Sequence, residues 1–292
     1  MAKCYNLVSN FIFMEQKMSE TCNHDCASCA QNCGDKTEIQ KIKPHEHSKI
    51  KHVIGILSGK GGVGKSLVSG LLASEMAKKG FKCAVLDADI TGPSIPKIFG
   101  VHQRVQATPD GSAILPATAK NGVKIMSLNL LLEDETDPVI WRGTLINSAV
   151  TQFWKDVIWG DIDYMFIDMP PGTGDVTMTV FQMLPIDGII IVTSPQELVG
   201  MIVDKAVKMA GKMNISVLGL VENMSYLKCP DCGKEMEIFG KSRVYETAGK
   251  FNISPAVRLP LCQQTAKLCD EGSISQIEEP ALEPLLSKLA TL

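Results

Sequence analysis

The stretch Gly59-Lys60-Gly61-Gly62-Val63-Gly64-Lys65-Ser66 fits the phosphate-loop pattern G-x-x-x-x-G-K-S/T. It follows an apolar run, Val53–Leu57, and precedes a helical stretch. The glycines let backbone N–H groups turn toward phosphate oxygens, and the N-terminus of the next helix adds positive potential. All eight residues are predicted to contact a nucleotide. We expect Lys65 to neutralise the β- and γ-phosphates and the Ser66 hydroxyl to bind Mg²⁺. A glycine-rich turn without a ligand is the weaker alternative, because the strand and the helix flank the loop as the motif requires.

Strand and helix patterns alternate along the chain from Lys51 onward. Several of the apolar runs are apolar on both faces, as strands of a parallel sheet covered by helices should be. This alternation predicts an α/β fold with a doubly wound, mostly parallel sheet. The predicted strands are Val53–Leu57, Lys82–Leu86, Lys124–Leu128, Tyr164–Ile167, Gly188–Val192 and Val217–Val221, and the predicted helices are Lys65–Lys79 and roughly 143–158, 176–184 and 196–212.

The first 50 of the 292 residues differ from the rest, because they are rich in cysteine, then charged, and have little hydrophobic period. We assign 1–50 to an N-terminal extension and linker, and 51–292 to one ATPase-type domain. Translation could start at Met1 or at Met18, just before the cysteine cluster. The net charge of −3 gives no reason to expect nucleic acid as a partner. No apolar run approaches the ~20 residues of a membrane span, and no signal peptide is recognisable, so the expected compartment is the cytoplasm.

Acidic residues end two of the predicted strands, where a phosphate loop needs groups that hold Mg²⁺ and orient water. Asp168 ends the run Tyr164–Ile167, so we interpret it as a Walker B aspartate that binds Mg²⁺. The Pro- and Gly-rich segment that follows it is interpreted as a γ-phosphate-sensing loop. Asp87 and Asp89 follow the earlier predicted strand Lys82–Leu86. Asp87 is predicted to support the metal shell, and Asp89 is predicted to orient the attacking water. For each of the three, a helix cap or a turn residue is the alternative.

Two further residues extend the predicted nucleotide site. Asn223, after the run Val217–Val221, could contact the adenine edge, although a turn asparagine explains it equally well on chemistry alone. Lys60 is not needed for the geometry of the loop. A lysine directly after the first glycine resembles the deviant Walker A loop of the MinD/ParA and nitrogenase iron-protein group. That resemblance implies that Lys60, a catalytic residue beside Lys65 and Asp89, reaches a partner's nucleotide across a homodimer; a solvated loop lysine is the alternative.

Cys229 and Cys232 form a C-x-x-C knuckle. Two thiolates at this spacing can face one metal, but they do not complete a tetrahedral shell. In a two-fold dimer the same pair from each chain would supply four thiolates, which suit a [4Fe-4S] cluster or zinc. A zinc-stapled dimer and a redox-active or unliganded pair are the alternatives.

The extension carries a second set of thiols, with the spacing C-x3-C-x2-C-x3-C. Four soft ligands in so short a segment favour an iron–sulfur cluster, with zinc or an unmetallated tail as alternatives. These residues are Cys22, Cys26, Cys29 and Cys33. The scattered cysteines Cys83, Cys262 and Cys269 are interpreted as packing residues.

Several long motifs, in order, resemble the Mrp/ApbC family of iron–sulfur cluster carrier ATPases. They are Ser58–Ser66, Asp87–Pro96, Ile140–Gly143, Ile167–Asp175, Glu222–Tyr226 and Cys229–Gly240. The cysteine-rich front end resembles the eukaryotic cytosolic scaffold branch. The resemblance implies slow ATP hydrolysis, homodimerisation, a transient [4Fe-4S] cluster at Cys229 and Cys232, and recipient apoproteins as partners. It also favours Asn223 as an adenine contact. The chain departs from the family at Leu67 and Thr144, where threonine and proline are usual, and the front cysteines are spaced differently from the scaffold pattern.

Two other functions share some of these features. A positioning ATPase of the MinD/ParA kind would share Lys60, but it predicts a basic amphipathic C-terminus, and Ile277–Leu292 carries one lysine among glutamates and leucines. It would also leave the C-x-x-C without a purpose. A structural zinc protein with a regulatory ATPase is the second alternative, and metal analysis of anaerobically purified protein distinguishes it from a cluster carrier.

Overall fold

The computed structural model describes residues 41–89, 94–132, 143–196 and 199–292. The four cysteines of the predicted front cluster, Cys22, Cys26, Cys29 and Cys33, lie outside the described residues. The first described segment, 41–47, packs against the domain: the Ile42 N–H donates to the Met183 carbonyl at 2.8 Å, and the Trp154 indole donates to the Ile42 carbonyl at 2.9 Å. In the described ranges, no helix is both long and apolar enough to cross a bilayer.

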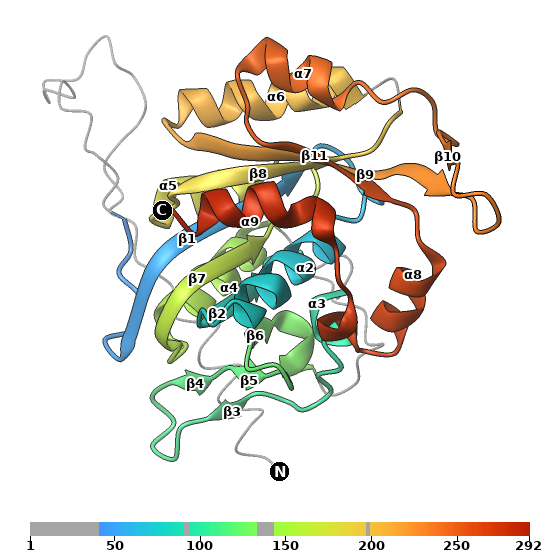
Figure 1. Cartoon of the computed structure of the whole chain (residues 1–292). Helices are drawn as coiled ribbons and strands as arrows, with labels where there is room; N and C mark the ends of the chain where they lie inside the picture. The colour runs from blue at the N-terminus through green and yellow to red at the C-terminus, as the bar shows by residue number, and fades with distance from the viewer. Residues whose placement is uncertain (1–40, 90–93, 133–142, 197–198) are drawn as a thin grey trace, which may run out of the picture.

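A nine-stranded sheet forms the centre of the molecule, in the order β10-β9-β8-β1-β7-β2-β6-β5, with β11 paired to β9 (Figure 1). Among the described strands of this sheet, the inner ones are parallel, and the short strands β5 and β10 run antiparallel to their neighbours. This topology confirms the predicted α/β fold with a mostly parallel sheet. The strands are β1 (Ser48–Ser58), β2 (Cys83–Asp87), β5 (Ala117–Thr118), β6 (Lys124–Ser127), β7 (Gly160–Asp168), β8 (Gly188–Thr193), β9 (Ser216–Lys228), β10 (Glu235–Met236) and β11 (Ala256–Pro260), and a separate ribbon pairs β3 (Gln106–Ala107) with β4 (Ile114–Leu115).

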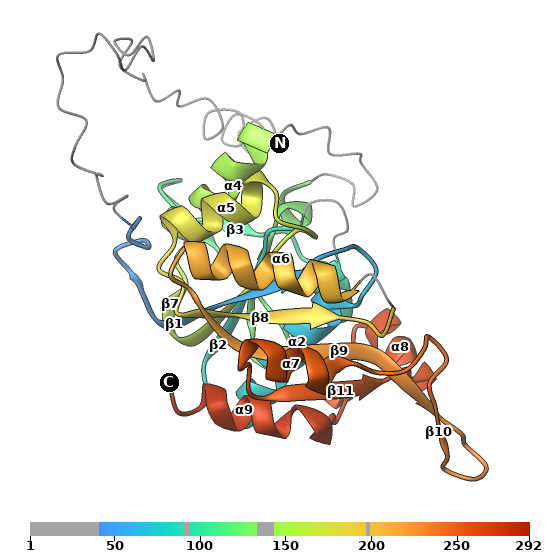
Figure 2. The same cartoon turned by 90° about the horizontal axis from the view of Figure 1, so that it is seen from above.

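Helices cover both faces of the sheet, as Figure 2 shows for α4, α5 and α6 on one side of β8 and α2 and α9 on the other. The first face carries α4 (Gly143–Lys155), α5 (Asp175–Met183), α6 (Val199–Lys212) and α7 (Val244–Phe251). The second carries α2 (Lys65–Lys78), α3 (Ser94–Ile98) and α9 (Glu283–Leu289). The helix α8 (Gln263–Asp270) has no fully buried residue, although Leu268 and Cys269 pack partly buried against the second core. 3-10 turns lie at Leu128–Leu131, Ile274–Gln276 and Pro280–Leu282.

The two faces have separate hydrophobic cores, and β1 contributes to both of them. Successive side chains of a strand point to opposite faces, so Ile54 and Ile56 pack under α2 while Val53 and Leu57 pack under the opposite helices. All four are at most 2% exposed. A strand buried on both faces places its carboxyl end, at Ser58, at the centre of the sheet edge where the phosphate loop begins.

Candidate nucleotide site and cysteine knuckle

The carboxyl ends of three adjacent strands meet at the predicted phosphate loop. The loop connects Ser58, the last residue of β1, to Lys65, the first residue of α2. Asp168 at the end of β7 is the register partner of Ile56 on one side and of Asp87 on the other. The structure therefore brings together the predicted loop and the predicted acidic residues, because parallel neighbours end at the same edge of the sheet.

The loop has the backbone conformation that its glycines permit. Gly62 and Gly64 have φ of 78° and 80°, in the left-handed region that side chains disfavour. At Gly64 a side chain is excluded a second time, since a Cβ would lie 2.2 Å from Nδ2 of Asn223. That amide donates a 3.0 Å hydrogen bond to the Val63 carbonyl. Asn223, 4% exposed, thus lies against the loop itself, so its first structural role is to hold Val63 and Gly64.

Lys65 lies in a buried cluster of carboxylates. Its Nζ is 2.9 Å from Asp168 Oδ2 and 3.3 Å from Asp89 Oδ2. Burial alone would lower the pKa of Lys65, but the charges of Asp168 and Asp89 outweigh it, so the pKa is raised and the ammonium stays charged. Burial, and then the nearby charge of Asp168, raise the pKa of Asp87 well above its usual value. The cluster therefore combines one charged ammonium, that of Lys65, with three carboxyl groups, those of Asp87, Asp89 and Asp168.

Hydroxyl groups of α2 complete this cluster. The Ser66 Oγ donates to Asp168 Oδ2 at 2.6 Å, and the Ser69 Oγ donates to Asp168 Oδ1 at 2.6 Å. Ser69 was not identified from the sequence, although its spacing of three residues from Ser66 places both on one face of the helix. Hydroxyl and carboxylate oxygens are the hard donors that Mg²⁺ prefers, so Ser66 and Asp168, with Asp87 behind them, fit that ion.

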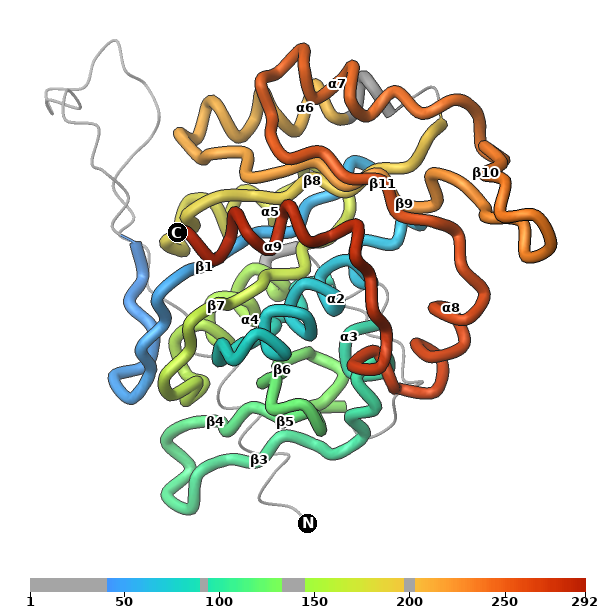
Figure 3. Tube along the Cα trace, viewed as in Figure 1, coloured from blue at the N-terminus to red at the C-terminus, as the bar shows by residue number. Residues whose placement is uncertain are grey.

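A cavity of about 490 Å³ opens above the loop. One wall is formed by the loop, including Gly61, Lys65 and Ser66, together with Asp89. The opposite wall is formed by Ala266, Cys269 and Asp270 of α8, which lies beside α3 (Figure 3). No sequence pattern pointed to this wall. Cys269 is the scattered cysteine that bears on the site, and burial raises its pKa, which keeps the thiol protonated.

The segment after Asp168 also contacts the phosphate loop. Pro171 lines the cavity, and the Gly172 N–H donates to the Ser58 carbonyl at 2.7 Å. Lys60 extends from the other side of the loop, where its ammonium donates to the Gln196 side-chain oxygen of the same chain. The predicted γ-phosphate-sensing segment therefore lies against the phosphate loop. The Lys60 side chain, in this single chain, is hydrogen-bonded to Gln196.

The cysteine knuckle lies at the tip of the β9–β10 hairpin, which projects from the body of the molecule (Figures 1 and 2). The Cys229 N–H donates to the Lys234 carbonyl, and the Gly233 N–H donates to the Cys229 carbonyl, both at 2.9 Å. Backbone N–H groups of Cys232 and Asp231 lower the pKa of the Cys229 thiol. Cys232 is exposed and Cys229 half-buried. Among the described residues, no group of three or more His, Cys, Asp or Glu side chains is placed to hold a metal ion.

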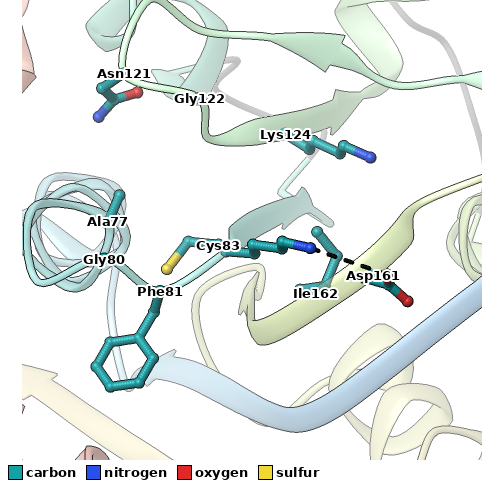
Figure 4. Close-up of a pocket in the computed structure, with 10 residues that line it drawn as sticks. Ala77, Gly80, Phe81, Cys83, Asn121, Gly122, Lys124, Asp161 and Ile162 are labelled. Carbon is teal, nitrogen blue, oxygen red and sulfur yellow. Dashed lines mark ion pairs between the residues drawn. The ribbon is translucent and has the colours of Figure 1, made fainter.

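A second hollow, of about 390 Å³, lies at the amino ends of β2, β6 and β7 (Figure 4). Its lining includes Lys82, Cys83 and Lys124. Both of its lysines have partners: Lys82 pairs with Asp161 at 3.9 Å, and the Lys124 ammonium donates to the Trp159 carbonyl at 2.5 Å. Burial raises the pKa of Cys83 to about 12. This hollow has no glycine-rich phosphate loop, so the nucleotide cavity is the one at the opposite edge of the sheet.

A parallel sheet with this loop after β1 and a carboxylate at the end of the adjacent strand defines a P-loop NTPase. A family model described as "ParA: NUBPL iron-transfer P-loop NTPase" matches residues 49–291. The chain belongs to that family, and it is an ATP hydrolase of the P-loop class.

Two relatives of this chain carry the same name. An iron-sulfur cluster carrier protein of Clostridium perfringens is 43% identical over 268 residues, which cover 90% of this chain and 93% of the relative. A protein of the same name from Methanocaldococcus jannaschii is 44% identical over 258 residues, covering 86% and 89%. Both alignments span the nucleotide site and the knuckle hairpin together, since neither could cover so much of the chain otherwise.

Two solved structures have a fold similar to that of this chain. A nucleotide-binding protein from Archaeoglobus fulgidus, in complex with ADP, has a TM-score of 0.72 and 39% identity, and covers 80% of this chain and 91% of its own. The cell division ATPase MinD of Pyrococcus furiosus has a TM-score of 0.56 at 18% identity, covering 82% of this chain and 97% of its own. At that identity MinD shows the fold alone, so it lends no support to a positioning function.

Proposed function

We propose that this protein is an ATP-dependent iron–sulfur cluster carrier, which holds a [4Fe-4S] cluster as cargo at Cys229 and Cys232 and transfers it to recipient apoproteins. The observation that carries the proposal is the pairing of a nucleotide cavity with a projecting hairpin that offers two thiols and no further ligand among the described residues. A structural zinc site held by a single chain would complete its own shell there, so the zinc alternative that two thiols leave open is the zinc-stapled dimer.

The incomplete ligand set supports a homodimer. A cluster of this kind takes four thiolates, and one knuckle supplies two. In a two-fold assembly whose axis passes between the hairpins, each hairpin meets its own copy, and Cys229 and Cys232 of each chain would together supply the four. Exposure of Cys232 at the hairpin tip leaves room for such an approach.

The residues of the nucleotide site have these proposed roles. The loop Gly59–Ser66 cradles the phosphates of ATP, and Lys65 neutralises them once it leaves the carboxylates that it now contacts. Ser66 and Asp168 hold Mg²⁺, with Asp87 in the shell behind them, and Asp89 orients the attacking water. Asn223 reaches the adenine while its amide holds the loop. Lys60 leaves Gln196 to reach the partner's nucleotide, which completes the site only in the dimer.

Nucleotide and cluster must influence each other in such a carrier. ATP can change how firmly the hairpins hold the cluster only if it binds the two arrangements of the dimer with unequal affinity, and the effect is then reciprocal. The cytoplasm, where thiols stay reduced, is the proposed compartment. Cys22, Cys26, Cys29 and Cys33 remain a prediction of a second thiolate site.

The test is anaerobic reconstitution of the full chain with iron and sulfide, followed by incubation with an apoprotein that needs a [4Fe-4S] cluster. Iron–sulfur absorption on the carrier, and its movement to the recipient at a rate that depends on ATP, are the expected results. A chain that retains zinc, takes up no iron and activates no recipient would support the zinc-protein alternative instead.

Exposed apolar residues beside the knuckle provide a separate test of the homodimer. Met236, Ile238 and Phe239 follow the cysteines and are 39%, 54% and 40% exposed. If a second copy packs here, Ile238→Asp should weaken self-association at least about tenfold, because a desolvated charge at a contact costs more than 1.4 kcal/mol. Analytical ultracentrifugation of the cluster-loaded protein measures it. Leu115→Asp, at an exposed apolar residue on β4, is the control, and an equal effect of both variants would reject the hairpin as the contact.

A further inference from the structure

Arg258 of β11 connects the knuckle hairpin to the strand that supports the phosphate loop. Its Nη2 donates to Glu237 Oε1 at 3.0 Å, and Glu237 lies directly after β10 in the hairpin. Its Nε donates to the Ser225 Oγ at 2.7 Å, and its guanidinium lies 5.2 Å from the centre of the Tyr226 ring. Both ends of the guanidinium fork are therefore engaged, one with the hairpin and one with the middle of β9.

The contacts continue from Ser225 to the nucleotide site. The Ser225 hydroxyl donates to Glu222 Oε1 at 2.6 Å, and both residues are buried. Glu222 is the register partner of Arg258 and the chain neighbour of Asn223, whose amide donates to the Val63 carbonyl. A continuous series of contacts thus runs from the phosphate loop through β9 to Arg258, and from Arg258 to the hairpin that carries the cysteines.

The strand is bent in the middle of this series. Met224 has φ of 53°, which is uncommon for a residue with a side chain, and the pairing of β9 with β11 shifts register between Arg258 and Pro260. Such irregularities re-aim a strand, and they occur often beside active sites. The bend separates the half of β9 that touches the loop from the half that becomes the hairpin. The Arg258 side chain contacts both sides of the bend, because it donates to Ser225 at the bend and to Glu237 in the hairpin.

Stability alone gives little reason for this ion pair. The side chains of Arg258 and Glu237 are 21% and 37% exposed, and partly exposed pairs contribute little to folding. A planar guanidinium held at both ends is, however, well suited to fix one group relative to another.

We propose that Arg258 is a positioning residue that couples the nucleotide state of the phosphate loop to the placement of the Cys229–Cys232 hairpin, through Ser225 on one side and Glu237 on the other. The inference rests on the proposed function, in which nucleotide and metal share one molecule. Because coupling is reciprocal, a metal at the knuckle should change nucleotide affinity by the same factor by which nucleotide changes metal affinity.

The experiment uses the full chain with Cys22, Cys26, Cys29 and Cys33 changed to serine, so that these four thiols do not bind the metal probe in place of Cys229 and Cys232. Co²⁺ is the probe, since thiolate ligation gives it visible absorption. Co²⁺ is titrated with and without saturating Mg²⁺ and a non-hydrolysable ATP analogue, and the ratio of the two affinities is the coupling factor. For the parent chain we expect a factor of at least about five.

Arg258→Met and Glu237→Gln should each reduce this factor to within about twofold of unity, while metal-free nucleotide affinity changes less than about threefold. The double variant should lose no more than either single variant, because both remove the same link. Glu237→Gln keeps the shape of an exposed side chain, so it serves if Arg258→Met fails to fold. Lys241→Met, which removes an exposed cation four residues along the chain from Glu237, is the matched control and should retain the factor.

The possible results distinguish failure of the positioning role of Arg258 from failure of the proposed cluster-carrier function. Variants that retain the coupling factor of the parent chain overturn the role of Arg258 and leave the carrier function standing. A parent chain that binds both Co²⁺ and nucleotide without any coupling overturns the role of Arg258 together with the ATP dependence of the proposed carrier, and leaves the metal site standing. A parent chain with no thiolate–Co²⁺ absorption overturns the metal site itself, and the inference with it.

Discussion

Replacing Lys65 by methionine is expected to reduce ATP hydrolysis by roughly 10²–10³-fold and to destabilise the nucleotide-free protein. The loss of activity follows from the loss of the charge that faces the phosphates. The loss of stability follows from the buried cluster, because Asp168 and Asp89 would lose the ammonium that lies 2.9 and 3.3 Å away. Breaking a buried ion pair by removing one partner costs about 3–5 kcal/mol.

Phosphate release measures the first effect, and urea unfolding without nucleotide measures the second. The matched control is Lys60→Met, which removes another lysine of the same loop. Its ammonium contacts the neutral Gln196 and lies outside the carboxylate cluster, so the unfolding free energy should change by less than about 1 kcal/mol. A Lys65→Met protein as stable as the parent would show that the buried carboxylates do not depend on the lysine.

Changing Cys229 and Cys232 together to alanine is expected to abolish cluster transfer while ATP binding stays within about twofold of that of the metal-free parent chain. The thiols lie on a projecting hairpin, half-buried and exposed, so their loss removes little packing. The Cys229 carbonyl and N–H hold the turn through backbone bonds, which alanine keeps. The fold of the hairpin should therefore survive the loss of both thiols.

Transfer is measured as activation of an apoprotein under anaerobic conditions, and binding is measured by nucleotide fluorescence. Cys262→Ala, which removes another partly exposed thiol, is the control and should leave both quantities unchanged. Transfer at the parent rate by the double variant would move the cargo site away from the knuckle, and loss of ATP binding would show that the hairpin supports the nucleotide site structurally.

Local patterns explain how much of the site could be predicted. The loop, Asp168 and the knuckle each require particular residues at fixed spacing, and parallel strands bring their carboxyl ends together wherever they lie in the sequence. Helix ends were less certain: the helix predicted over roughly 143–158 ends at Lys155, and β1 begins at Ser48, ahead of its apolar run. The first residues of β1, from Ser48 onward, pair with the start of β7 at Gly160, and hydrophobic periodicity does not mark either segment as a strand.

The features that were not predicted depend on tertiary contacts. The helix α8 has no fully buried residue and was not among the helices predicted from the sequence, yet it forms a wall of the nucleotide cavity. The contact of Arg258 with Glu237 joins two segments 21 residues apart through the pairing of β9 with β11. Asn223 was predicted to face the adenine, but its hydrogen bond to the Val63 carbonyl could be found only from the folded loop.

The most direct test of the shared cluster is native mass spectrometry of anaerobically reconstituted protein in which Cys22, Cys26, Cys29 and Cys33 are serine. The expected species contains two chains and a single [4Fe-4S] cluster, and it disappears when Cys229 and Cys232 are also replaced. A cluster carried by a single chain, or a dimer that contains only zinc, would contradict the proposal that two knuckles share one cluster.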